Sequence, residues 1–300
     1  MSAPPIPNGP LRVGVVGAGP QARLVHAPGF AHDPRTTLAG IWARRPEAAH
    51  ELASAHGTVA CESYDELLDG SDAVAFAVPP DVQAELAVIA ARAGKALLLE
   101  KPIALDLDAA QRLADAVDDA RVGSQVVLSW RYADAVRAFL AAVASCEPIG
   151  GRGHFVSGSA LGGPFATPWR LEQGPLLDLG PHVIDTLDAA LGPVVGVRAH
   201  GDRHRWVGLL LDHESGLTSE VSLAARSNVD PARAGAEVYT EEGVIEVDAA
   251  AAVGPDDMVA TLVGELVDTA RGVPHPLDVH RGLHLQRVLN DAARDLASRR

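Results

Sequence analysis

The stretch LRVGVVGAGPQA, residues 11–22, decides the fold of the first half of the chain. Its opening run Leu11–Val16 is apolar except for Arg12 and is bounded by glycine, which is typical of a buried parallel strand. Gly17, Gly19 and Ala22 then fit the pattern G-x-G-x-x-(G/A) between a strand and the start of a helix, the context in which this pattern binds a dinucleotide. The stretch therefore predicts a nucleotide-binding turn, with a plain strand-to-helix turn as the alternative.

The glycine turn has the parts that a pyrophosphate needs. Gly17 permits a tight turn, Gly19 lets the pyrophosphate approach the backbone, and the small Ala22 lets the helix pack closely on the sheet. Amide groups at the start of the helix supply donors for the anion. We expect the cofactor contacts of this turn to come from Gly17, Ala18, Gly19, Pro20 and Gln21.

Apolar runs alternate with helical stretches through residues 11–145. The apolar runs lie at 11–16, 38–43, 73–78, 96–99 and 125–129, and the helical stretches lie near 20–32, 46–56, 81–93, 106–120 and 132–145. This alternation predicts a doubly wound parallel sheet of the Rossmann type.

After residues 146–151 the pattern changes to consecutive strand-like segments at 152–160, 194–200, 206–212, 217–224, 235–240 and 243–247, with helices near 176–191, 257–271 and 281–298. Consecutive strands predict a mostly antiparallel sheet. The predicted fold class is therefore α/β, a Rossmann domain followed by an α+β domain with an open-faced sheet. The predicted parts are a flexible arm at 1–10, the Rossmann domain at 11–129 and the second domain, including the C-terminal helices, at 130–300.

The composition excludes several function classes. The net charge of −14 is spread along the chain, which disfavours binding to nucleic acid or an anionic membrane. The sequence has no run of about 18 apolar residues, and its start lacks the regions of a signal peptide. Two cysteines this far apart, Cys61 and Cys146, do not indicate a disulfide framework, and we interpret both as packing residues. We therefore expect a soluble, cytoplasmic protein that acts on a small molecule.

The end of the second predicted strand bears on cofactor choice. An NAD-preferring enzyme places an acidic residue there, whereas this chain reads Ala43-Arg44-Arg45. Two guanidinium groups suit a 2′-phosphate, so NADP(H) is favoured over NAD(H), which stays possible. The alternative is that arginine is simply the usual surface cation of a chain with 23 arginines and two lysines.

One of the two lysines follows a predicted strand directly. The run at 96–99 leads into Glu100-Lys101-Pro102, at the carboxyl edge of the sheet where ligands of such folds bind. A lysine in this place can orient and polarise a substrate oxygen. Lys95, at a predicted helix-to-strand turn, is expected to be a solvated surface charge.

Asp178 and His182 form the second candidate site. If this segment is helical, the two side chains share one face. Histidine donates and accepts protons near neutral pH, and a neighbouring carboxylate can orient it. Pro181 either starts the helix or kinks it. A capping aspartate beside an incidental histidine is the alternative, while His200 and His204 are too far apart on a strand edge to predict a metal site.

Together these residues resemble the Gfo/Idh/MocA family of glucose-fructose oxidoreductase and inositol dehydrogenase-like enzymes. The resemblance covers nearly the whole chain. It rests on the glycine turn, on Ala77-Val78-Pro79-Pro80, on Ala93-Gly94-Lys95 leading to Glu100-Lys101-Pro102, and on the block from Asp178 to His182.

The resemblance implies that the second domain binds substrate between the nicotinamide and its sheet, and that this sheet builds homodimers or homotetramers. Lys101 matches the family's catalytic lysine, Asp178 its carboxylate for a substrate hydroxyl, and His182 its general acid/base. Further cofactor contacts are expected from Ala43, Arg44, Arg45, Val78, Pro79, Pro80, Glu100 and Lys101.

Two other segments fit a substrate pocket. Trp130-Arg131-Tyr132 resembles the family's Asn-x-Arg-Phe/Tyr stretch, and Pro168-Trp169-Arg170 resembles a substrate-facing loop. Substrate contacts are expected from Arg131, Tyr132, Trp169 and Arg170, since aromatic faces pack sugar-like rings and arginine binds hydroxyls or carboxylates. The alternative is that the tryptophans are core anchors. Gln83 stands where many members have His, and Ser129 where Asn is usual, so sugar specificity stays open.

The sequence thus predicts an oxidoreductase that transfers a hydride between NAD(P) and a secondary alcohol or carbonyl of a sugar, polyol or sugar acid. Fold does not decide function by itself. The alternatives are a catalytically idle nucleotide-binding regulator on the same fold, an imine reductase, or an NAD-dependent glycosidase.

Overall fold

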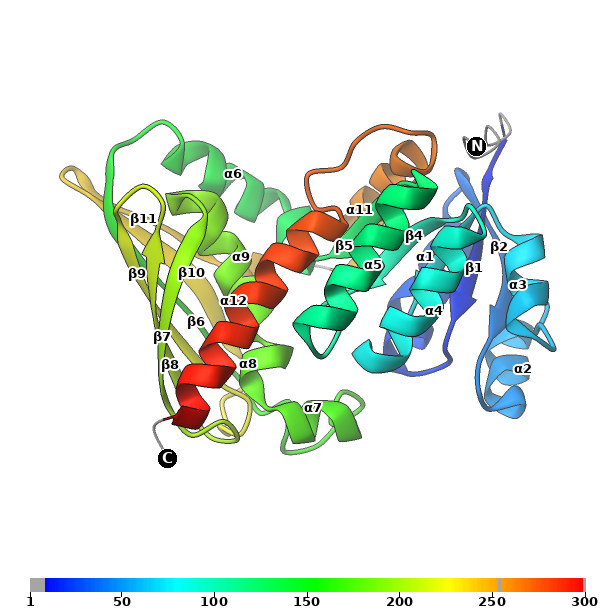
Figure 1. Cartoon of the computed structure of the whole chain (residues 1–300), viewed down its shortest axis with the longest axis horizontal. Coiled ribbons are helices and arrows are strands. Elements are labelled where there is room, and N and C mark those ends of the chain that lie inside the picture. The colour runs from blue at the N-terminus through cyan, green and yellow to red at the C-terminus, as the bar shows by residue number, and fades with distance from the viewer. Residues whose placement is uncertain (1–8, 253–254, 299–300) are drawn as a thin grey trace. The chain divides into compact units, whose positions relative to one another are not determined.

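A computed structural model describes residues 9–252 and 255–298 of the chain, with side chains of 255–257 left undescribed. The chain divides into two compact units (Figure 1). The first runs to Val127 and takes in Pro255–Leu283, and the second begins at Leu128 and takes in the chain from His284.

The first unit is built on a five-stranded parallel sheet in the order β2-β1-β3-β4-β5. Its strands are β1 (Leu11–Val16), β2 (Thr36–Trp42), β3 (Ala73–Phe76), β4 (Ala96–Glu100) and β5 (Ser124–Val127). The direction of strand addition reverses between β1 and β3, and because crossovers are right-handed, the helices fall on both faces. The predicted doubly wound sheet is confirmed.

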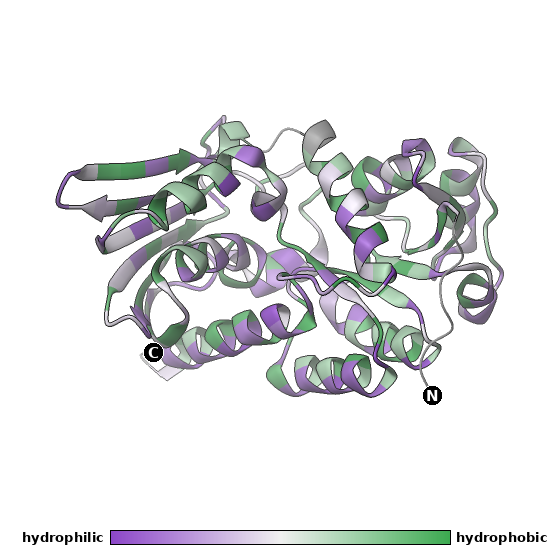
Figure 2. Ribbon diagram, turned by 90° about the horizontal axis from the view of Figure 1, so that it is seen from above, coloured by the Kyte–Doolittle hydropathy of each residue, from purple (hydrophilic) through white to green (hydrophobic). Residues whose placement is uncertain are grey.

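Helices connect and cover these strands. They are α1 (Ala27–His32), α2 (Pro46–Ala55), α3 (Tyr64–Gly70), α4 (Pro80–Arg92), α5 (Leu107–Ala120) and α11 (Pro255–Ala270). Ser63 and Asp106 cap α3 and α5 by accepting hydrogen bonds from the amides of Glu66 and Ala109. Most helices carry both hydrophobic and hydrophilic residues along their length (Figure 2), as expected where one side packs on a sheet.

The helix after the glycine turn contains a π-helical segment. Residues 20–32 are helical, as predicted, but η1 (Ala22–His26) has π geometry before α1 begins. Such wide turns occur mostly as single insertions and are frequent at functional sites.

The second unit contains a six-stranded mixed sheet in the order β11-β10-β6-β9-β8-β7. The strands are β6 (Pro148–Val156), β7 (Val194–Gly201), β8 (Val207–His213), β9 (Thr218–Ala224), β10 (Arg233–Thr240) and β11 (Gly243–Asp248). Only the pair β6–β9 is parallel among these described strands, so the prediction of a mostly antiparallel sheet is confirmed.

The other elements of this unit are helices. They are η2 (Ser129–Tyr132), α6 (Asp134–Val143), α7 (Pro168–Gln173), α8 (Pro175–Asp178), α9 (Gly180–Leu191) and α10 (Ala249–Ala252); α12 (Val279–Ser298) begins in the first unit. The single helix predicted around 176–191 is two helices that meet at Leu179, because Pro181 occupies the first turn of α9, where it needs no amide partner.

Three features bear on the predicted domain limits. Residues 1–8 of the predicted arm lie outside the described residues, and the carbonyl of Gly9 accepts a hydrogen bond from Arg271. Pro255–Leu283, which the sequence pattern placed in the second domain, groups with the first unit. The division into cofactor and substrate domains stays a prediction.

No helix within 9–252 or 255–298 is long and apolar enough to cross a membrane.

Small residues on β6 let α9 lie close to the sheet. A Cβ added to Gly153 would be 2.5 Å from Cγ1 of Val183, and one added to Gly151 would be 3.1 Å from a methyl of Leu191. Contact at this distance brings the buried helix that carries His182 directly onto the sheet.

Gly153→Ala is expected to lower the free energy of unfolding by about 1–3 kcal/mol, because the added methyl overpacks the α9 contact. Urea unfolding followed by circular dichroism measures the change. Gly208→Ala on β8 is the control, since the nearest atom to a Cβ there is 3.9 Å away. Equal losses in the two variants would contradict the packing explanation.

Candidate active site

The glycine turn leaves the carboxyl end of β1 at the point where the strand order reverses. Gly17 has a φ of +110°, and a Cβ there would be 2.5 Å from the carbonyl oxygen of Ala77 after β3. Gly17 is therefore required by the packing of the turn itself. A Cβ added to Gly19 would be 3.8 Å from the same oxygen, so this part of the backbone has room for a ligand to approach.

Arg23 stabilises the turn from the π-helical segment. Its Nε donates to the carbonyl of Ala18 at 3.1 Å, and its guanidinium pairs with Glu51 of α2 at 2.9 Å. Its amide donates to the carbonyl of Gly19. Arg23 was not predicted from the sequence, because its partners are set by the fold.

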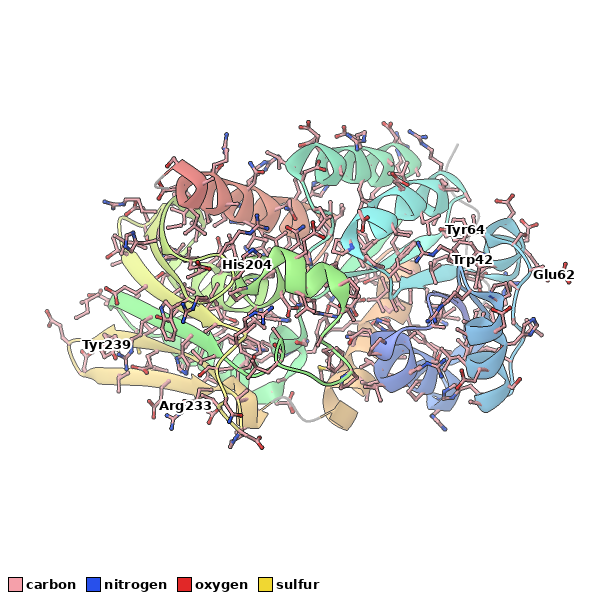
Figure 3. All side chains as sticks on the ribbon, turned by 90° about the horizontal axis from the view of Figure 1, so that it is seen from below. Trp42, Glu62, Tyr64, His204, Arg233 and Tyr239 are labelled. Atoms are coloured by element: carbon pink, nitrogen blue, oxygen red, sulfur yellow. The ribbon has the colours of Figure 1, made fainter. Side chains whose placement is uncertain are left out.

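The end of β2 exposes the two predicted arginines. Arg44 and Arg45 are exposed, and neither guanidinium has a hydrogen bond or ion pair with the part of the chain that the structure describes. Before them, Trp42 packs against Tyr64 with ring centroids 5.3 Å apart (Figure 3). Tyr64 donates to the carbonyl of Leu86, and burial raises the pKa of its phenol.

The turn Val78-Pro79-Pro80 follows β3 on the other side of the reversal point. Pro79 is extended, with φ −55° and ψ 149°, and Pro80 is the first residue of α4. The glycine turn and this turn therefore lie on either side of the reversal point, which is where doubly wound sheets bind ligands.

Lys101 follows β4 at the same carboxyl edge. Glu100 is the last residue of β4 and pairs with Val127 of β5, and the peptide bond between Lys101 and Pro102 is cis. Lys101 is half-buried. Lys95, at the other end of the strand, donates to the carbonyl of Ser71 at 3.0 Å. Its ammonium is therefore hydrogen-bonded to the protein, whereas the sequence predicted a solvated surface charge.

Two buried polar side chains contact Glu100. Gln83 of α4 is fully buried, accepts from the amide of Glu100 and donates to its carbonyl, each at 2.8 Å. Nε2 of His26 lies 2.8 Å from Oε1 of Glu100. In the sequence Gln83 stood out only as a departure from the family, and His26 was not predicted at all. A polar residue within an apolar helix face would have been the signal.

Asp178 and His182 lie on successive short helices. Asp178 is the last residue of α8, and His182 is in the first turn of α9. Both are buried, at 6% and 7% exposure, so neither carboxylate nor imidazole is a solvated surface group.

Arg170 is paired with Asp178. Its Nε donates to Oδ1 at 2.9 Å, and its guanidinium carbon lies 4.7 Å from the ring centre of Trp169 and 5.4 Å from that of Phe165. Arg170, which the sequence predicts to contact the substrate, therefore forms an ion pair with Asp178, and two aromatic faces hold its guanidinium group in place.

Trp130 stacks on His182. The ring centroids are 5.7 Å apart with an interplanar angle of 18°, and Phe155 of β6 lies 5.6 Å from the Trp130 ring. Trp130 is 4% exposed and Tyr132 is 1% exposed, so both are anchored in the core, whereas Trp169 is half-buried. The stack fixes the plane of the imidazole.

A second ion pair lies one turn beyond His182. Arg131 contacts Oδ2 of the fully buried Asp185 at 3.2 Å. His182 is thus flanked along the chain by two aspartates, and each of these has an arginine partner.

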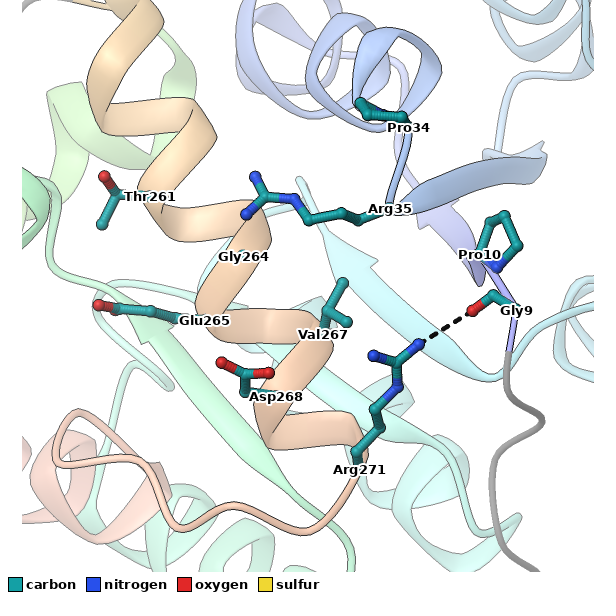
Figure 4. Close-up of a pocket in the computed structure, with 10 residues that line it drawn as sticks. All are labelled: Gly9, Pro10, Pro34, Arg35, Thr261, Gly264, Glu265, Val267, Asp268 and Arg271. Carbon is teal, nitrogen blue, oxygen red and sulfur yellow. Dashed lines mark hydrogen bonds between the residues drawn. The ribbon is translucent and has the colours of Figure 1, made fainter.

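Within the first unit, a cavity of about 750 Å³ lies at the amino edge of the parallel sheet, opposite the edge with the glycine turn and Lys101 (Figure 4). It is bounded by residues 9–10 and 34–35 and by α11. Arg35 is paired with Asp33, and Arg271 donates to Gly9. Because doubly wound sheets bind ligands at the carboxyl edge and these arginines already have partners, we assign no cofactor role to this cavity.

The parallel sheet, its reversal point and the glycine turn define an NAD(P)-binding Rossmann domain. The profile "Oxidoreductase family, NAD-binding Rossmann fold" matches residues 11–127, and the profile "GFO/IDH/MocA C-terminal domain" matches residues 133–246. The chain belongs to the Gfo/Idh/MocA family of oxidoreductases.

Similar proteins include named sugar enzymes. The chain is 29% identical to glucose-6-phosphate 3-dehydrogenase of Bacillus subtilis over 58% of its length and 52% of the relative. It is 31% identical to dTDP-3,4-didehydro-2,6-dideoxy-alpha-D-glucose 3-reductase of Streptomyces violaceoruber over 65% of its length and 58% of the relative. The matches thus span little more than half of these relatives.

Solved structures share the whole fold. GenD2 from gentamicin A biosynthesis, solved in complex with NAD, superposes with a TM-score of 0.85 at 22% identity and covers 98% of both chains. A probable dehydrogenase from Thermotoga maritima superposes with a TM-score of 0.86 at 20% identity, covering 97% of this chain and 98% of that one.

Arg170→Met is expected to lower the free energy of unfolding by about 1–3 kcal/mol, because it leaves the buried Asp178 carboxylate without its guanidinium partner. Chemical denaturation measures this loss. Arg198→Met is the control, since its pair with Asp212 is 61% and 41% exposed and its loss should cost less than about 0.5 kcal/mol. The idea fails if Arg170→Met is as stable as the control.

Proposed function

We propose that this protein is a dehydrogenase or reductase that transfers a hydride between a nicotinamide cofactor and a secondary alcohol or carbonyl of a sugar, polyol or sugar acid. The observation that carries the proposal is that the glycine turn after β1 and Lys101 after β4 leave the same edge of one parallel sheet. That edge is where the fold binds ligands.

The residues at this edge suit a dinucleotide. The open backbone at Gly19 would admit the pyrophosphate, with Ala18, Pro20 and Gln21 beside it, and the turn Val78–Pro80 would line the opposite side. When bound, the nicotinamide would supply or accept the hydride.

We propose NADP(H) as the preferred cofactor. Ala43-Arg44-Arg45 has no carboxylate to bind a free ribose 2′-hydroxyl, and both guanidinium groups lack partners among the described residues. Arginine binds phosphate oxygens bidentately, so these two side chains suit a 2′-phosphate.

The reaction needs a polarised oxygen and a proton carrier. The ammonium of Lys101 would polarise the substrate oxygen, and His182 would give that oxygen a proton in reduction and remove it in oxidation. Asp178 would accept a hydrogen bond from a substrate hydroxyl, with its charge balanced by Arg170. Trp130 would keep the His182 ring in one plane.

A polyhydroxylated substrate fits the relatives' names. The Bacillus and Streptomyces relatives are named for reactions at position 3 of a hexose. We accordingly propose a ring hydroxyl or its ketone as the reacting group. Assembly as a homodimer or homotetramer through the second sheet and a cytoplasmic location stay predictions.

Arg44→Ala is expected to weaken NADPH binding by about tenfold or more, because a charge-assisted contact to the 2′-phosphate is lost, and to change NADH binding by less than about twofold. Titration by cofactor fluorescence measures both. Arg92→Ala, which changes an exposed arginine at the end of α4, is the control. If the wild-type protein bound neither cofactor, the oxidoreductase proposal would be wrong.

Lys101→Met is expected to lower turnover by about 100-fold while cofactor affinity is kept, because it removes the cation that polarises the substrate oxygen. Steady-state rates with a panel of sugars and polyols, in both directions, provide the measurement. Lys95→Met should turn over at the wild-type rate. Equal rates in the two variants would contradict the assignment of Lys101.

A further inference from the structure

The backbone and the carboxylate of Glu100, the residue before Lys101, are each held by a different buried side chain. Gln83 comes from α4 and holds the backbone, and His26 comes from η1 and holds the carboxylate. Both side chains are almost fully inaccessible, at 0% and 1% exposure. These two contacts constrain the position of Glu100 strongly, because the loss of either would leave a buried polar group without its hydrogen bond.

The amide of Gln83 serves the whole turn. Its Oε1 accepts from the amide of Glu100, and its Nε2 donates to the carbonyl of Glu100 at 2.8 Å and lies 3.2 Å from that of Ile103. A third carbonyl, of Pro102, is 3.4 Å away. One side chain thus bonds the backbone on both sides of Lys101, and a fixed backbone restricts where the lysine side chain can start.

Among the described residues, only one of the two ring nitrogens of His26 has a hydrogen-bond partner. Its Nδ1 is buried and has no hydrogen-bond partner among the described residues, while Nε2 faces Glu100. Because an ionised carboxylate can only accept, Nε2 is assigned as the donor in this contact. Stacking against Phe30, at 6.1 Å and 9° between ring planes, holds the ring in this orientation.

His26 also connects two parts of the candidate site. It is the last residue of η1, the wide helical segment that follows the glycine turn, while Glu100 ends β4 beside Lys101. The hydrogen bond between them therefore joins the helix expected to face the cofactor phosphates to the turn expected to carry the catalytic cation.

We propose that His26 and Gln83 are positioning residues for Lys101. They fix the carboxylate and backbone of Glu100, and through them the place and the electrostatic surroundings of the Lys101 ammonium. The catalytic meaning of this role rests on the proposed function, but the positioning itself does not. Catalytic groups must be held to within about 0.5 Å of their working geometry, which is what buried supporting contacts provide.

Competitive labelling of amines tests the proposal on the protein without cofactor. Lys95 and Lys101 are its only lysines, and cleavage after arginine releases them in one peptide, residues 93–112. Trace acetylation with acetic anhydride across a pH range, with fragment-ion mass spectrometry, gives the ratio of their rates. Lys95 is the internal reference, since it contacts Ser71 at the opposite end of β4.

The disruptive variants are His26→Leu and Gln83→Met, and each should change the labelling ratio by about threefold or more, equivalent to half a pKa unit. His26→Gln, whose amide can reach Glu100, should restore the wild-type ratio. Gln125→Met is the matched control, because Gln125 is an equally buried glutamine that donates to the carbonyl of Leu262 on α11.

If a disruptive variant fails to fold, two closer replacements take its place. His26→Asn is too short to reach Glu100, and Gln83→Glu keeps the shape and the acceptor but loses the donor. An unchanged ratio in folded variants, or an equal change in Gln125→Met, overturns the proposal. A changed ratio in a protein that turns over no substrate would instead refute the proposed function and leave the positioning role in place.

Discussion

The close approach of the glycine turn to the end of β3 is the constraint on which the candidate site depends. Gly17 sits against the carbonyl of Ala77 in a backbone conformation that side chains avoid. The parallel pairing of β1 with β3 places the turns after both strands at the same edge, where the strand order reverses, and glycine at position 17 lets the two turns lie this close. The turn with Lys101 leaves the next strand, β4, at the same edge. The parallel sheet thus gathers residues that are far apart in sequence.

The second unit contains buried charged side chains around His182. Asp178 and Asp185 are buried on either side of His182, and Arg170 and Arg131 neutralise them. An unpaired carboxylate in such a place would be costly, so the pairs explain how two aspartates can be kept beside a buried histidine. Trp130 stacks on the imidazole and sets its plane, and Phe155 packs against the same ring at a tilt of 50°.

Arginine has two distinct uses in this acidic chain. Where it is buried or half-buried, as in Arg131 and Arg170, it balances a specific carboxylate. At the end of β2, Arg44 and Arg45 have no such partner in the described structure and carry uncompensated positive charge at the ligand-binding edge. A net charge of −14 therefore coexists with a local concentration of positive charge at the end of β2.

The sequence by itself determined the features that are local or periodic. The strand-turn-helix pattern around Gly17, the alternation of strands and helices, the arginines at the end of β2 and the place of Lys101 after β4 could all be predicted, because each depends on neighbouring residues. Only the tertiary structure decided the partners: Gln83 and His26 for Glu100, Arg170 for Asp178, Trp130 for His182, and the grouping of Pro255–Leu283 with the first unit. Most of these contacts join residues distant in sequence, and Arg170 meets Asp178 only because the chain bends between α7 and α8. Packing and register, which periodicity does not encode, bring these residues together.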